Sequence, residues 1–327
     1  MPVGALVQRL GAADAGRRGG FGWIAPALLA LAVALPWLVG DFYLRLAIEA
    51  FLLGALALSV DILLGFAGLL SLGQAMYFGL SAYLTALCYL HVTQSFWLVA
   101  MIVALAVALV AGALGAVAIR AKGVYFALIT FGAAEIAGKI VHNTRALGGS
   151  DGLLGIPVPA IALPGVELPL RSNLAFYYVV LTVIALVYLA VTRVLATPFG
   201  SVLSAIRDNA SRVPCLGYNP FWYKFFAYLL AAEVAAVGGL FYPLLRGFVG
   251  PDLFGFEIST QSVVMALVGG VGTLIGPLVG GVVITFLQSV LGSFTERHLF
   301  VLGVIFILFV RFLPGGLFGL SRRGRAP

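Results

Sequence analysis

The chain has 327 residues, of which 62% are hydrophobic and 9% are charged, whereas an average soluble domain has roughly 25% charged residues. Water could not solvate such a chain, so the composition excludes an ordinary soluble domain. The formal net charge of +7 does not indicate nucleic-acid binding, because the basic residues lie in short loops and tails, where they act as topology signals.

Apolar runs recur from residue 23 to residue 313. A helix needs about 20 apolar residues to cross about 30 Å of hydrocarbon, and no barrel-type alternation is present. The sequence therefore predicts an all-α, polytopic bundle of about ten spans, some of them short or broken by glycine. Their approximate limits are 23–40, 45–64, 67–90, 96–119, 123–141, 173–195, 223–245, 258–271, 273–292 and 299–313.

The first span resembles a signal peptide only superficially. It has about 18 apolar residues, against about 7 to 15 in a signal peptide, and residues 41–43 after it offer no small-residue cleavage site. We therefore expect this span to be retained. The bundle would form one domain over 23–313, between a cytoplasmic tail at 1–22 and a basic cytoplasmic tail at 314–327.

An even number of spans places both termini on one side of the membrane. With the termini inside, most basic residues lie on or beside the cytoplasmic face: Arg9, Arg17, Arg18, Arg120, Lys122, Arg193, Arg207, Arg212, Lys224, Arg311, Arg322, Arg323 and Arg325. The others fall outside: Arg45, Lys139, Arg145, Arg171, Arg246 and Arg297. This asymmetry follows the positive-inside rule, so the sequence predicts cytoplasmic termini.

Two polar segments separate the spans. Residues 142–172 are rich in glycine and proline and predict an ordered external loop. Residues 196–222 are placed in the cytoplasm and predict short surface helices. There Val202, Leu203 and Ile206 fall at helical spacing, so the segment is a candidate docking surface for a partner.

Two glycine-rich stretches, 65–73 and 269–276, resemble each other. In transporters, glycine-interrupted segments at corresponding positions of two halves indicate a central pathway, because unwound backbone is tolerated only against protein or a water-filled cavity. Equally, such glycines permit close helix packing. Both interpretations stay open for each glycine, including Gly272.

Charged residues inside apolar segments each cost about 2.5 to 3.5 kcal/mol at a helix centre. Asp61 and Arg311 lie near predicted cytoplasmic ends and Lys139 near an outer end, where we expect the side chains to reach the membrane surface. Glu135 and Glu233 lie deeper, and either serve the pathway or form an internal hydrogen bond.

The candidate pathway residues combine these two carboxylates with polar and glycine positions of the spans. For the uncharged polar side chains, packing hydrogen bonds are an equally good explanation. The set is Ser71, Gln74, Glu135, Glu233, Gln261 and Gly272.

The sequence lacks the motifs of an enzyme. The three lysines, at 122, 139 and 224, are followed by Gly123, Ile140 and Phe225, so no phosphate-binding loop ending in Lys-Ser or Lys-Thr exists. The histidines are isolated, which disfavours a metalloprotease and any metal site. If transport is driven by ATP, the nucleotide site must lie on another chain.

Five stretches together resemble the LivH/LivM permeases of branched-chain amino acid ABC importers, and their order and spacing are closer to LivM. They are Leu64–Tyr83, Gly123–Glu135, Gly149–Leu153, the pair Ala205–Asp208 and Leu216–Tyr218 followed by Tyr223 and Lys224, and Gly269–Pro277. The similarity covers about residues 45 to 320.

This resemblance implies a subunit of the bacterial inner membrane that imports branched-chain amino acids. Its partners would be a LivH-like permease, two cytoplasmic ATPases that use the ATP, and an extracytoplasmic solute-binding protein, while this chain binds no cofactor. The loop that couples it to an ATPase would include Ala205, Ile206, Arg207, Asp208, Leu216, Gly217 and Tyr218.

The chain also departs from the pattern of that family. Gln74 stands where the family often has His, and Asp61 where Asn is common. Related permeases carry urea, short amides or other amino acids, which are alternative cargoes. An ion-coupled secondary transporter is a further alternative, because broken helices and deep carboxylates also suit one.

Overall fold

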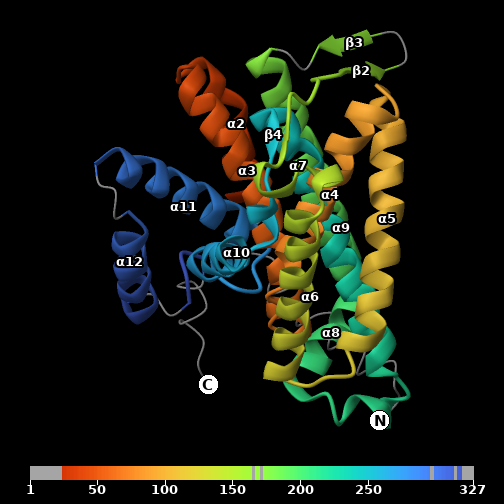
Figure 1. Ribbon diagram of the computed structural model, residues 1–327. Coiled ribbons are helices and arrows are strands. Elements are labelled where there is room, and N and C mark those ends of the chain that lie inside the picture. The colour runs from red at the N-terminus through yellow and green to blue at the C-terminus, as the bar shows by residue number, and fades with distance from the viewer. Residues whose placement is uncertain (1–23, 164–165, 170–171, 295–297, 313–314, 319–327) are drawn as a thin grey trace. The chain divides into compact units, whose positions relative to one another are not determined.

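The computed structural model describes residues 24–163, 166–169, 172–294, 298–312 and 315–318 (Figure 1). By its internal contacts the chain divides into two units, one ending at Leu44 and one beginning at Arg45. In the first unit α2 (Ile24–Ala34) runs directly into a 3-10 turn, η1 (Leu35–Trp37). Pro36 stands at the start of this turn, where its missing N–H costs nothing.

Helices follow one another along the rest of the chain, and every predicted span has a helix at its place. They are α3 (Asp41–Asp61), the π-helix η2 (Ile62–Ala67), α4 (Gln74–His91), α5 (Phe96–Ala118), α6 (Val124–Asn143), α7 (Asn173–Leu195), α8 (Pro198–Asn209), α9 (Pro220–Arg246), α10 (Phe256–Gly269), α11 (Ile275–Phe294) and α12 (His298–Phe312). The predicted helical class is confirmed.

Six helical stretches of the described residues are long and apolar enough to cross a membrane: α3 with η2, α5, α6, α7, α9 and α11. The combined segment of α2 and η1 is shorter, as is α10. The protein is therefore a polytopic helical membrane protein.

The centre of the second unit is formed by α3, α4 and α9. Helix α9 packs along both α4 and α5 (Figure 1), and small residues allow the close approach. A Cβ on Gly281 of α11 would lie 2.7 Å from the Cα of Gly54 of α3, and one on Gly115 of α5 would lie 2.8 Å from the Tyr228 ring of α9. Glycine thus serves close helix packing at these positions.

Helices α5, α6 and α7 leave most of their surface uncovered by the chain. On α6 the large apolar side chains that are exposed are Val124, Tyr125, Leu128, Ile129, Ile136 and Ile140. An exposed apolar face of this size is what lipid or a second membrane subunit covers.

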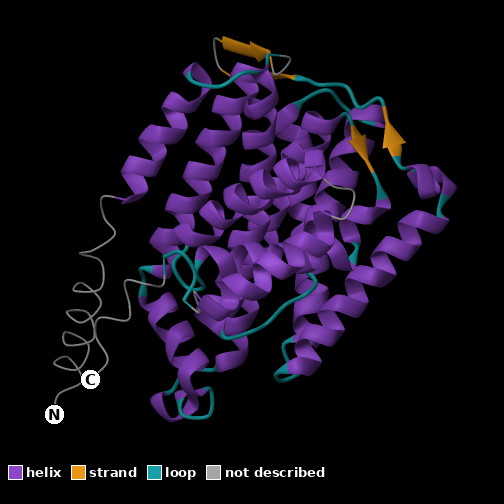
Figure 2. Ribbon diagram, turned by 90° about the vertical axis from the view of Figure 1, so that its left-hand side faces the viewer, coloured by secondary structure: helices purple, strands orange, loops and turns teal. Residues whose placement is uncertain are grey.

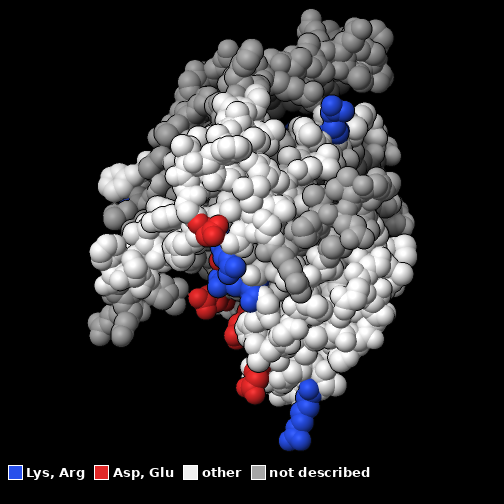
Figure 3. Space-filling model, turned by 90° about the horizontal axis from the view of Figure 1, so that it is seen from above, with Lys and Arg blue, Asp and Glu red and all other residues white. Residues whose placement is uncertain are grey.

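The sequence did not predict the strands of the loop at 142–172. β1 (Leu153–Leu154) pairs antiparallel with β4 (Phe248–Val249), and β2 (Ala160–Leu163) forms a hairpin with β3 (Val166–Pro169). Both pairs lie at the same end of the helices (Figure 2). Seen from that end, the charged side chains of the described surface are few and gather mainly in one mixed group (Figure 3).

Candidate functional site

The predicted cytoplasmic segment folds as α8 followed by a 3-10 turn, η5 (Val213–Leu216). Thr197 caps α8, since its Oγ1 accepts a hydrogen bond from the backbone N–H of Phe199 at 3.3 Å, and Pro198 occupies the first turn. The first residues of α8 therefore determine where the helix begins.

The apolar face of α8 is covered by the chain itself. Val202, Leu203 and Ile206 are buried, and Val202 and Ile206 cluster with Val213 and Tyr223. A partner could therefore meet only the opposite side of the segment, where Ala205, Asp208, Leu216, Gly217 and Tyr218 are exposed. Gly217 has φ of +84°, a conformation that glycine adopts without strain.

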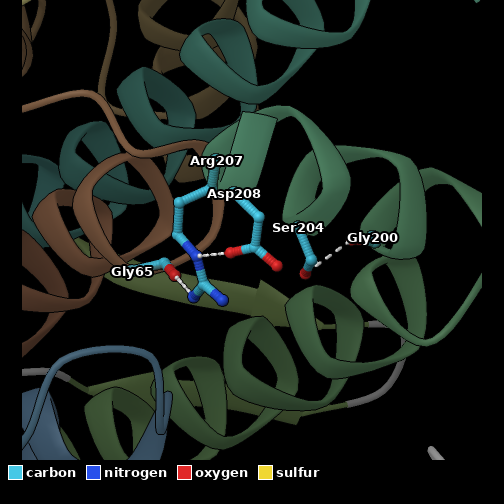
Figure 4. Close-up of polar contacts among 5 residues, drawn as sticks. All are labelled: Gly65, Gly200, Ser204, Arg207 and Asp208. Atoms are coloured by element: carbon cyan, nitrogen blue, oxygen red, sulfur yellow. Dashed lines mark hydrogen bonds and ion pairs between the residues drawn. The ribbon is translucent and has the colours of Figure 1, made fainter. Parts of the chain in front are cut away.

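Arg207 connects α8 to the end of the central helix α3. Its Nη1 donates a hydrogen bond to the carbonyl oxygen of Gly65 at 2.5 Å, and its Nε donates to Asp208 Oδ1 at 3.2 Å (Figure 4). Gly65 belongs to η2, which is capped at its C-terminal end by Gly68 with φ of +68°. A Cβ on Gly68 would lie 2.9 Å from Cγ of Arg207, so the arginine packs directly on this helix end.

Asp61, the last residue of α3, is fully buried. Its Oδ1 accepts a hydrogen bond from the backbone N–H of Gly272 at 2.5 Å, and its Oδ2 accepts one from Leu274 at 3.2 Å. The prediction that this side chain reaches the membrane surface is therefore wrong. The carboxylate instead holds the turn between α10 and α11, because backbone N–H groups solvate it in place of water.

The turn that Asp61 holds has an unusual backbone. Gly270, Gly272 and Leu274 all have positive φ, and the value for Leu274 is +60°, which is uncommon for a residue with a side chain. A backbone of this kind persists only where its surroundings hold it in place. The two hydrogen bonds to Asp61 do so here.

The two glycine-rich stretches therefore meet in space. A Cβ on Gly65 would lie 2.5 Å from Asp61 Oδ1 and 2.6 Å from the backbone nitrogen of Gly272. For Gly65 the structure thus gives close approach to the Gly272 backbone as the reason for glycine, and for Gly272 it gives a φ of +77°.

The other side of the stretch 68–73 packs on α6. Thr130 Oγ1 accepts a hydrogen bond from the backbone N–H of Leu72 at 3.3 Å. Ser71 and Gln74 are buried nearby, with Gln74 Nε2 3.5 Å from Ser71 Oγ. Gln74 Oε1 has no hydrogen-bond partner among the described residues. A buried amide oxygen of this kind is available to a ligand or a water.

The remaining pathway candidates make no hydrogen bond to this cluster among the described residues. Gln261 of α10 donates to Gln288 of α11 at 2.6 Å. Glu233 lies on α9, and its buried Oε1 has no hydrogen-bond partner among the described residues. Glu135 lies half-buried on α6. The hydrogen bonds of the described residues thus join Ser71 with Gln74 and Gly272 with Asp61, but do not join all six candidates in one site.

One ion pair of the membrane-spanning helices was not predicted. Arg246 at the end of α9 donates to Glu49 of α3. The two residues are 197 positions apart in the chain, so no local sequence pattern could predict that they pair. No group of three or more potential metal ligands occurs among the described residues.

These features define a polytopic membrane protein in which one polar cluster joins a surface helix to broken helices inside. The sequence model described as "Branched-chain amino acid transport system / permease component" matches residues 42–310, and the chain belongs to that family. This confirms the family resemblance seen in the sequence.

Curated relatives agree with this assignment. The chain is 27% identical over 318 residues to "High-affinity branched-chain amino acid transport system permease protein LivM" of Escherichia coli (strain K12), covering 90% of this chain and 74% of that protein. The protein of the same name from Salmonella typhimurium is 27% identical over 316 residues. A "Probable branched-chain amino acid transport permease protein LivM" of Methanocaldococcus jannaschii matches over 132 residues at 27% identity, covering 40% of this chain and 38% of that protein. No solved structure gives a significant match.

Proposed function

We propose that this chain is the LivM-type permease subunit of an ABC importer that translocates branched-chain amino acids across the bacterial inner membrane. The observation that carries the proposal is the family match over residues 42–310. The names of the two relatives that cover nine-tenths of the chain support the same cargo. Urea, short amides or other amino acids are not favoured, because no relative named above is described as carrying them.

In this proposal the subunit works in a complex and has no nucleotide site or cofactor of its own. It pairs with a LivH-like permease, two ATPase subunits supply the energy from ATP, and an extracytoplasmic solute-binding protein delivers the amino acid. The sequence supports the division of labour, because none of its lysines stands in a phosphate-binding loop.

The membrane topology belongs to the same proposal. About ten spans within one domain at 23–313 would place both termini, the tails at 1–22 and 314–327, and the segment 196–222 in the cytoplasm. The strand-bearing loop at 142–172 would lie outside. The opposite ends of α7 support this arrangement, since α7 follows that loop directly and α8 begins after its other end.

The parts of the site have distinct roles in this proposal. The exposed side of 196–222 docks on an ATPase. The pathway candidates Ser71, Gln74, Glu135, Glu233, Gln261 and Gly272 lie on the helices, or on the turns between them, that rearrange between outward-open and inward-open states. The unpartnered oxygens of Gln74 and Glu233 support contact with a polar solute, because buried polar atoms ordinarily have a partner.

The test is ATP hydrolysis by the reconstituted complex. We expect leucine, isoleucine and valine to stimulate hydrolysis when the loaded binding protein is added, and urea and acetamide to have no effect. Stimulation by urea or acetamide alone would contradict the proposed cargo. A purified chain that moves leucine with an ion gradient, without ATPase subunits, would establish the secondary-transporter alternative instead.

A further inference from the structure

Two polar connections meet at one short segment, residues 61–68. From one side, Arg207 of α8 donates to the Gly65 carbonyl. From the other, Asp61 accepts hydrogen bonds from Gly272 and Leu274 of the turn between α10 and α11. The surface helix α8 is thus connected to the α10–α11 pair through the end of α3.

The first connection suits a helix end. The last carbonyl groups of a helix have no partner within it, and the negative end of the helix dipole favours a cation there. Arg207 supplies both the donor and the charge, and Asp208 orients its guanidinium group from the neighbouring position. A hydrogen bond from a charged donor is about twice as strong as one between neutral groups.

The second connection is tightly packed. Asp61 is fully buried and its two carboxylate oxygens accept from two residues of one turn. Gly65 leaves no room even for a methyl group between Asp61 and Gly272. The segment that links both connections is a π-helix. This geometry is rare in proteins overall, but where it occurs it is often at a functional site.

We propose that Arg207 and Asp61 are positioning residues that join α8 through η2 to the α10–α11 turn, so that a displacement of α8 moves the start of α11. This inference rests on the proposed function, in which an ATPase docks on the segment that carries α8. It adds the internal route by which that movement reaches the broken helices.

A simpler role for Arg207 would be direct contact with the ATPase. The two roles differ in what happens at Asp61, which is buried and cannot touch a docked subunit. If the internal route operates, Arg207→Gln and Asp61→Asn have the same effect. If Arg207 only docks, Asp61→Asn leaves the movement of α11 unchanged.

The movement can be measured without any transported solute. Spin labels on Val282 of α11 and Leu109 of α5, both exposed, report the distance between these helices in the complete complex, after Cys88 and Cys215 are replaced by alanine. The distance is compared before and after trapping with ATP and vanadate. Arg193→Gln is the matched control, because it removes the same charge at the end of α7 beside α8 and belongs to neither connection.

We expect trapping to change the distance in the parent protein and in Arg193→Gln, and at least four-fifths of this change to be lost in Arg207→Gln and in Asp61→Asn while the ATPase subunits remain bound. An unchanged response in either variant would overturn the inference. So would the absence of a response in the parent, or loss of the ATPase subunits from Arg207→Gln, which would assign Arg207 to docking.

These outcomes are separate from the proposed function. A complex that changes distance on trapping but is not stimulated by branched-chain amino acids would refute the cargo and leave the route intact. A complex that is stimulated by them, with unaltered distances in both variants, would refute the route alone.

Discussion

Asp61 is the residue whose role the sequence conceals most completely. Its partners lie 211 and 213 residues further along the chain, and its place near the end of an apolar run favoured a side chain reaching the membrane surface. In the folded chain its carboxylate instead accepts hydrogen bonds from the backbone N–H groups of Gly272 and Leu274. Hydrogen bonds from backbone N–H groups lower the cost of burying this carboxylate in a membrane span.

We predict that Asp61→Ala lowers the thermal unfolding temperature of the detergent-solubilised protein markedly. Each backbone N–H left buried without an acceptor costs roughly 1–3 kcal/mol. Asp208→Ala is the control, because the side chain of Asp208 is 71% exposed and its pairing with Arg207 at the surface contributes at most about 1 kcal/mol. Equal melting temperatures for the two variants would contradict the assigned contacts of Asp61.

A second prediction concerns the contact between the two glycine-rich stretches. We expect Gly65→Ala to destabilise the protein by about 1–3 kcal/mol, because the added methyl group would overlap both the buried carboxylate of Asp61 and the backbone of Gly272. Gly132→Ala on α6 meets nothing within 4 Å and should leave the melting temperature unchanged or raise it slightly. The comparison requires only thermal unfolding of the two variants, and a larger loss in Gly132→Ala would show that the two stretches do not meet.

At the scale of elements, hydropathy predicted where the helices lie but not where they begin. The run 67–90 was predicted as one span, yet α4 begins only at Gln74. Residues 68–73 are apolar enough to continue a helix, but Gly68 is left-handed and Thr130 holds Leu72 from the side. Similarly, β1 and β4 were not predicted, because two-residue strands carry no pattern and their partners are far apart in the sequence.

For helix α8 the sequence pattern correctly predicted an apolar face, but it did not predict what covers that face. The helical spacing of Val202, Leu203 and Ile206 is confirmed, but the face they form is covered by the chain itself. Amphipathic periodicity identifies an apolar face and cannot say whether the same chain or another one covers it.

We therefore predict opposite consequences for the two sides of this segment. Tyr218→Ala, at an exposed position, should reduce amino-acid-stimulated ATP hydrolysis at least fivefold without changing the melting temperature. Leu203→Ala, at a fully buried position, should destabilise the protein by about 2–5 kcal/mol. If Tyr218→Ala melts early with its stimulation intact, the exposed side is not the docking surface.

At the scale of the whole molecule, composition and charge distribution were sufficient to predict a helical membrane protein. Five dispersed motifs were sufficient to predict its family. The contacts between those motifs could not be predicted from the sequence, because they join residues about 140 to 210 positions apart. The same charge distribution predicts the orientation of the chain in the membrane.

We predict that Cys215 faces the cytoplasm. It is exposed, while Cys88 is buried, so a membrane-impermeant maleimide should label the protein in inside-out vesicles and not in intact cells. The Cys215→Ser variant gives the background level of labelling. Labelling of Cys215 in intact cells at the inside-out rate would reverse the proposed topology, and with it the assignment of 196–222 to an ATPase.

Uptake of radiolabelled leucine by proteoliposomes that contain the whole complex tests the central claim most directly. With ATP inside and the binding protein outside, we predict accumulation that stops when ATP is replaced by a non-hydrolysable analogue and that is unaffected by collapsing ion gradients. Accumulation that persists without ATP, or that follows an imposed ion gradient, would contradict the assignment of this chain as the permease of an ATP-driven importer.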